Sequence, residues 1–158
     1  MPRLPFAEDV LFSALVGVGL AIAFHVPVGA AWACMVCAMA GHSLRSALLQ
    51  IDLSLAMSSL TAAFAAAFLA RALASRFKVP PVTFAFPGVV TLMPGSYAFA
   101  AALGGVEIMH AGRDASPALI GQTFGFMVTT FLVLASIAIG LSLGLASPFR
   151  GTGSPFPK

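Results

Sequence analysis

Charged residues are scarce in this sequence. Only 8% of its 158 residues are Asp, Glu, Lys or Arg, whereas soluble domains carry about a quarter. Hydrophobic residues make up 59% of the chain, and the mean hydropathy is +1.01. This composition excludes an ordinary soluble domain and predicts an all-α integral membrane protein, because a helix satisfies its own backbone groups in lipid. The net charge is +3, but the basic residues are scattered, so no nucleic-acid partner is expected.

Motifs for catalysis and metal binding are also missing. The sequence has no G-x-S-x-G, no H-E-x-x-H and no paired aspartate motif, so an intramembrane enzyme is the least favoured function and no catalytic residue is expected. The two cysteines, Cys34 and Cys37, lie in an apolar segment without a second cysteine pair. We interpret them as small buried hydrophobic residues. No metal and no cofactor are therefore expected.

The N-terminal segment could be mistaken for a signal peptide, since Arg3 is followed by an apolar run. However, Glu8 and Asp9 stand directly before that run, where a signal peptide has positive charge. We therefore predict a tail over residues 1–8 and a transmembrane helical domain over residues 9–146. Residues 147–158 are rich in Pro and Gly, and are expected to be a disordered cytoplasmic tail.

Five apolar segments predict a bundle of about five transmembrane helices. They cover residues 10–24, 28–40, 53–73, 82–103 and 118–146. The second is shorter than the roughly 20 residues that a crossing needs. The fourth contains two Pro-Gly pairs, at residues 87–88 and 94–95, so it is expected to break near its middle.

Basic residues predict the orientation of these segments. Arg71, Arg76 and Lys78 lie at the end of the third segment, and positive charge favours the cytoplasmic side. The C-terminus is then cytoplasmic. The side of the N-terminus depends on whether residues 10–40 cross once or twice; five crossings, which we favour, place it outside.

Small residues recur every four positions in two of the segments. Such stripes predict close packing between helices in lipid. They are Ser54, Ser58, Ala62, Ala66 and Ala70 in the third segment, and the pairs Gly121 with Gly125 and Gly140 with Gly144 in the last.

The broken fourth segment is the leading candidate for a binding site. In hydrocarbon, a break survives only where protein buries it or a watery cavity lies beside it. The second half-helix would begin near Pro94, with the N–H groups of Gly95, Ser96 and Tyr97 facing the gap and Thr91 just before it. The positive N-terminal end of a half-helix attracts anionic groups. The alternative is a kink that only shapes packing.

Polar residues elsewhere supply further candidates. His42 and Arg45 are three residues apart, so on a helix they share a face. They form either an ordinary interfacial loop or a pair that attracts carboxylates, and Asp52 could pair with Arg45. Gln122 and Thr123, near the start of the last segment, could line a path, as could Thr129 and Thr130, unless the hydroxyls only bond their own helix.

These features, taken in order, resemble the small half of the threonine/serine exporter family over nearly the whole chain. The residues that carry the resemblance are Ala23-Phe24-His25-Val26-Pro27, Gly41-His42-x-x-Arg45, Ala70-Arg71, Pro81 and the run from Val89 to Pro94-Gly95. Many members have a further proline three residues before the Pro-Gly pair, where this chain has Thr91.

The resemblance implies a two-part transporter. In the family, two halves of about five helices are fused or are split into a large and a small subunit, and members export threonine and serine or, in some pairs, dicarboxylates such as succinate. It implies a large-subunit partner, a small carboxylate substrate and the bacterial cytoplasmic (inner) membrane. A structural or assembly subunit without its own substrate site remains the alternative.

Proton coupling is a further expectation, and it requires a titratable group within the membrane. The candidates in this chain are Glu107, His110, His25 and Asp52. None lies clearly at mid-membrane in the predicted segments, so a coupling carboxylate is expected from the partner.

Overall fold

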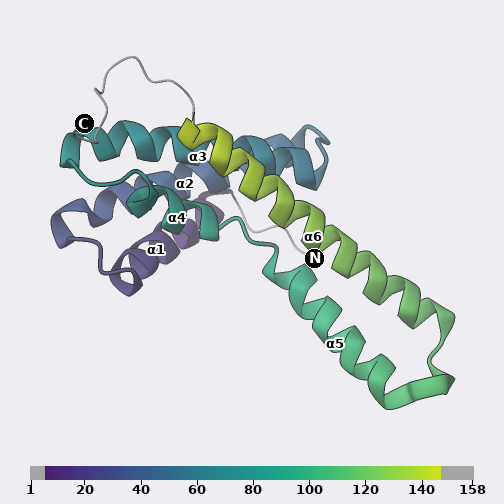
Figure 1. Cartoon of the computed structure of the whole chain (residues 1–158). Helices are drawn as coiled ribbons and strands as arrows, with labels where there is room; N and C mark the ends of the chain where they lie inside the picture. Colours follow the sequence, from purple (N-terminus) through teal and green to yellow (C-terminus); the bar gives the residue numbers. More distant parts are fainter. Residues whose placement is uncertain (1–5, 147–158) are drawn as a thin grey trace, which may run out of the picture.

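The computed structural model describes residues 6–146, and over this range the chain is all helical (Figure 1). The predicted all-α class is confirmed, while most of both predicted tails, residues 1–5 and 147–158, lies outside the described range. The α-helices are α1 (Phe6–Ala23), α2 (Ala31–Gln50), α3 (Leu55–Phe77), α4 (Val82–Val90), α5 (Gly95–Ala111) and α6 (Pro117–Ala146), with 3-10 turns η1 (Val28–Ala30) and η2 (Gly112–Asp114).

Two of the described helices, α3 and α6, are long and apolar enough to cross a membrane. The pair formed by α4 and the segment Gly95–Asp114 passes the same test together, with a bend of 57° at the break. Within α1, the apolar part Leu11–Ala23 is shorter. Length and composition therefore support two or three spans among the described residues, and the count of five stays a prediction.

The second helix is longer than the sequence predicted. We expected it to end near residue 40, but α2 continues unbroken to Gln50. Gly41, which directly follows the apolar segment, is buried: a Cβ built on it would lie 3.3 Å from the Cβ of Ala66 on α3. A glycine in a helix costs about 1 kcal/mol relative to alanine, and here it allows α2 and α3 to approach closely. His42 and Arg45 are consequently helical.

The first Pro-Gly pair does not break its helix. Pro87 lies inside α4 and is fully buried. Because proline has no N–H, the carbonyl of Thr83 four residues earlier loses its helical donor, and the thiol of Cys34 donates to that carbonyl with an S–O distance of 3.8 Å. A Cβ on Gly88 would lie only 2.9 Å from the Cβ of Cys37. This pair and the two buried cysteines thus join α4 to α2.

The predicted stripe on α3 forms part of the core. Ser58, Ala62, Ala66 and Ala70 are all buried, and Ser54 caps the N-terminus of the helix by accepting from the N–H of Met57. The hydroxyl of Ser58 donates to the carbonyl of Ser54 at 2.9 Å, so this buried polar group has its hydrogen-bond partner within its own helix. Small side chains therefore form the surface on which the neighbouring helices pack.

Helix α6 packs on α3 beside this stripe, at Ala63 and Ala67, through its second glycine pair. A Cβ on Gly140 would collide with the carbonyl oxygen of Leu60, and one on Gly144 would lie 2.6 Å from the Cβ of Ala67. Residue numbers rise together along the two helices, so α3 and α6 run parallel. If both cross the membrane, the chain between them must cross back once, as the broken α4–α5 segment would.

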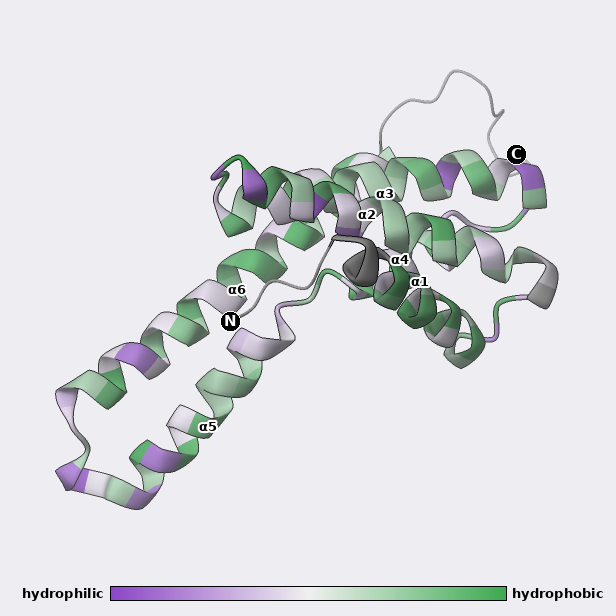
Figure 2. Ribbon diagram, turned by 180° about the vertical axis from the view of Figure 1, so that it is seen from behind, coloured by the Kyte–Doolittle hydropathy of each residue, from purple (hydrophilic) through white to green (hydrophobic). Residues whose placement is uncertain are grey.

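The other end of α6 leaves this core. We call α5, η2 and residues 117–132 of α6 the arm, and the remainder the body. In both ribbon views the arm projects from the body as a helical hairpin, and Figure 2 shows hydrophobic residues along its length and hydrophilic ones at its tip. The rings of Tyr97 and Phe126 lie 6.1 Å apart between its two helices. Helix α5 packs mainly on α6.

Candidate functional site

The chain changes direction between α4 and α5, at residues 91–94. Here the N–H of Leu92 donates to the carbonyl of Val89 at 2.9 Å, and that of Met93 donates to Val90 at 3.2 Å. The hydroxyl of Thr91 donates to the carbonyl of Gly88 at 2.7 Å. The last turn of α4 thus tightens and bonds its own carbonyls, which a break inside a membrane protein requires.

Arg45 of α2 binds the end of the broken helix. Its Nη1 donates to the carbonyl oxygen of Leu92 at 2.6 Å. The Leu92 side chain is fully buried, and its Cδ1 lies 3.7 Å from the position of a Cβ on Gly41, one helical turn before Arg45. Helix α2 therefore holds Leu92 by both its carbonyl and its side chain. A cation at a helix C-terminus is electrostatically favourable.

His42 lies one turn before Arg45 on α2, as their spacing predicted for a helix. It is half-buried and its Nδ1 atom is buried. Asp52, which we considered as a partner for Arg45, is exposed in the loop after α2. The structure therefore brings Arg45 to the break, with His42 on the same helix face.

The N-terminus of α5 begins at Gly95, as predicted. However, the N–H of Gly95 donates to the carbonyl of Met93 at 2.9 Å, so this group does not face a gap. The carbonyl four residues before Ser96 is that of Leu92, which accepts from Arg45. The carbonyl four residues before Tyr97 is that of Met93, which accepts from Gly95. The first-turn N–H groups of a helix have no intrahelical acceptor. Arg45 and the positive end of α5 thus flank one short break.

Gln122 and Thr123 lie elsewhere. Thr123 packs against Gly104 of α5, seven residues beyond Tyr97 and so about 10 Å further along the helix. Its hydroxyl bonds the carbonyl of Leu119 at 2.8 Å, and Gln122 is exposed on the arm. The hydroxyls of Thr129 and Thr130 also bond their own helix. The structure does not bring Gln122 or Thr123 to the break.

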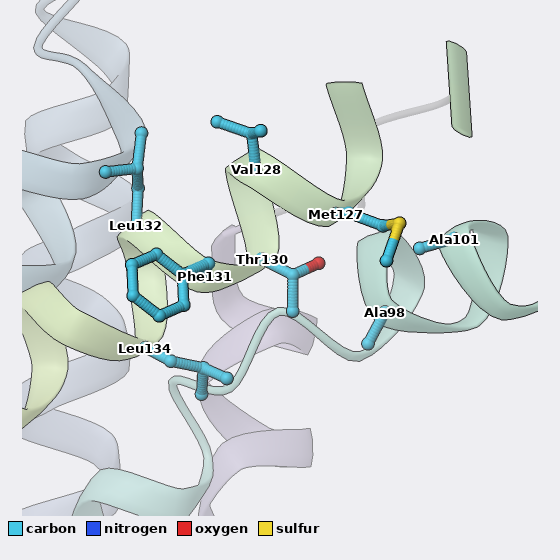
Figure 3. Close-up of a pocket in the computed structure, with 8 residues that line it drawn as sticks. All are labelled: Ala98, Ala101, Met127, Val128, Thr130, Phe131, Leu132 and Leu134. Atoms are coloured by element: carbon cyan, nitrogen blue, oxygen red, sulfur yellow. The ribbon is translucent and has the colours of Figure 1, made fainter. Parts of the chain in front are cut away.

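A cavity that we did not predict opens between α5 and α6, where the arm leaves the body (Figure 3). Its volume is about 540 Å³, and it is lined by Ala98, Ala101, Met127, Val128, Thr130, Phe131, Leu132 and Leu134. The small side chains of Ala98 and Ala101, one turn apart on α5, face larger side chains on α6. This pair of alanines is the feature of the sequence that could have indicated a cavity. Because the lining is apolar apart from Thr130, the cavity suits a hydrocarbon group better than a carboxylate.

Comparison with known proteins places these features in a family. The family model described as "Threonine/Serine exporter, ThrE" matches residues 9–146. An uncharacterized protein of Haemophilus influenzae is 33% identical over 135 residues, which are 85% of this chain and 45% of that protein. The chain thus spans about half the length of this relative. No solved structure matches the chain. Because the family match covers the helical domain from α1 to the end of α6, the chain belongs to the threonine/serine exporter family.

Proposed function

We propose that this chain is the small subunit of a two-component exporter that moves small carboxylate metabolites, threonine and serine or dicarboxylates such as succinate, across the bacterial cytoplasmic (inner) membrane. Its C-terminus is cytoplasmic. The family supports a membrane transporter of the threonine/serine exporter type. The observation that carries the substrate class is the bond from Arg45 to the carbonyl of Leu92 at the helix break.

A carboxylate binds an arginine side chain such as Arg45 more strongly than a backbone carbonyl does. A guanidinium binds a carboxylate through two parallel N–H bonds, and such charge-assisted bonds are about twice as strong as neutral ones. Leu92 is a neutral acceptor, and its carbonyl accepts from Nη1. An arriving carboxylate would exchange with Leu92 on the guanidinium and accept from the N–H groups of Ser96 and Tyr97, with Thr91 and Pro94 shaping the break.

The large subunit would bind the remaining polar groups of the substrate. A threonine site must also bind an ammonium and a hydroxyl, and a succinate site must bind a second carboxylate. The titratable residues that we considered for proton coupling, His25, Asp52, Glu107 and His110, are all exposed at the ends of helices or in loops of this chain. A coupling carboxylate would therefore come from the large subunit.

The alternative function is an assembly subunit with no substrate site. The packing of Gly140 and Gly144 on α3 favours it, since the small residues in this chain evidently hold helices together. The two proposals differ in what they require of Arg45. For an assembly subunit its charge matters only for stability, whereas a substrate site needs it for transport.

The test is export from cells that lack their own exporters and are loaded with threonine or with succinate. The large subunit is expressed with this chain, with Arg45→Gln, or with Arg113→Gln as a control on exposed η2. Glutamine keeps a polar side chain with N–H donors but removes the charge. We expect export to fall at least tenfold with Arg45→Gln at equal membrane levels of the complex, and to persist with Arg113→Gln. Unchanged export with Arg45→Gln would favour the assembly subunit.

A further inference from the structure

The two glycine pairs of α6 have different surroundings. Gly140 and Gly144 are buried against α3. Gly121 and Gly125 have the same spacing on the same helix, but a Cβ built on either would meet nothing within 4 Å. The packed pair shows what this spacing does in this protein: it allows another helix backbone to approach α6. The other pair lies open on the arm.

The open pair lies on the face of α6 that points away from α5. Thr123 faces α5 through its contact with Gly104. Gly121 and Gly125 are each two residues from Thr123, which on a helix places them about 160° around the axis. Helix α5 therefore leaves this face uncovered.

The open face continues an interface that the protein already uses. Steps of four residues lead from Gly125 through Thr129 to Val133 and Ile137, which are buried in the core cluster with Ala62 and Ala66 of α3. Bulky neighbours beside the glycines are exposed and form a wall, with Phe124 at 66% and Val128 at 39% exposure. The strip from Gly121 to Thr129 thus has the floor and the wall of a helix-packing groove that extends the α3–α6 interface along the arm.

We propose that this groove docks an apolar transmembrane helix of the second half of the exporter. The proposal rests on the two-component function argued above. Flexible lipid chains can cover a helix surface of any shape, whereas another helix backbone can approach closely only where small residues such as glycine leave room. The relative from Haemophilus influenzae supplies the source of such a helix, since more than half of it lies outside the 135 matched residues.

The first test places the photo-cross-linker benzoylphenylalanine at Phe124, and at Phe99 of α5 as the control, in the full chain in its native host. The two side chains are matched in type and in exposure, 66% each. We expect Phe124 to cross-link to a membrane polypeptide whose peptides align with the unmatched part of the relative, and Phe99 to cross-link to lipid. Products at Phe124 that contain only lipid, a second copy of this chain or an unrelated protein would overturn the proposal.

A second test fills the groove. The double variant Gly121→Leu with Gly125→Leu is compared with Gly105→Leu on α5, where a Cβ also meets nothing within 4 Å. Leucine favours helix more than glycine does, so lost assembly would report a filled groove and not a lost helix. We expect at least a tenfold loss of co-purification with the large subunit in the double variant only; equal co-purification in all variants would contradict the proposal.

The readouts separate the two proposals. If the pair assembles through Phe124 but exports no carboxylate, the proposed function fails and the docking surface stands. If the pair exports substrate but Phe124 cross-links only to lipid, the docking surface fails and the function stands.

Discussion

Replacing Gly140 by alanine should separate α6 from α3. The new Cβ would collide with the carbonyl oxygen of Leu60 and lie 3.1 Å from the Cβ of Ala63. Both atoms are fixed by the α3 backbone, so no side chain can rotate away. Inserting a methyl group into a packed interface costs about 1–3 kcal/mol. The gain in helix propensity from glycine to alanine, about 1 kcal/mol, offsets part of this cost.

Gly125→Ala isolates the packing cost, since this glycine lies on the same helix with nothing within 4 Å of its Cβ. It receives the gain in propensity without the collision. Reversible unfolding of the isolated chain in mixed micelles should therefore show Gly140→Ala less stable than Gly125→Ala by about 1–3 kcal/mol. Equal free energies of unfolding for the two variants would refute the close contact between α6 and α3.

Three further predictions concern single side chains. Cys34→Ala should lower the free energy of unfolding by about 1 kcal/mol more than Cys34→Ser, because serine keeps a donor for the carbonyl of Thr83; equal losses would contradict the bond. Arg71→Gln should lower it by about 1.5–3 kcal/mol, since Nη1 of Arg71 donates to the carbonyl of Leu145 at 2.8 Å; an unchanged midpoint in micelles would argue against it. Arg45→Lys, in the export assay, should retain more transport than Arg45→Gln but less than the unmodified chain, because lysine keeps the charge without bidentate geometry.

Local patterns in the sequence predicted much of the fold. Composition gave the all-α membrane class, and four-residue spacing identified Ala62 and Gly144 as packing positions, because in lipid small side chains at this period permit close approach. The family resemblance was confirmed by the match over residues 9–146. The break before Gly95 was also predicted, since proline and glycine both disfavour helix.

Features that depend on residues far apart in the sequence were not predictable. Proline disfavours a helix interior, but the carbonyl that Pro87 deprives of a donor is bonded by Cys34, 49 residues from Thr83. The second helix was expected to end near residue 40, because the packing of Gly41 on Ala66 cannot be read from either segment alone. Sequence spacing also could not place Gln122 beyond reach of the break, because that depends on how far α5 and α6 run beside each other.

Two arginines bind C-terminal helix carbonyls in this protein, and the comparison argues for a functional role of one. Arg71 binds Leu145 at the end of α6, and Arg45 binds Leu92 at the end of α4. Both bonds stabilise the negative end of a helix. Only at Leu92 does a second helix begin within three residues, and its N-terminus is positive. The break after α4 therefore brings together two positive groups, the guanidinium of Arg45 and the N-terminus of α5, an arrangement that suits a carboxylate and that the end of α6 does not reproduce.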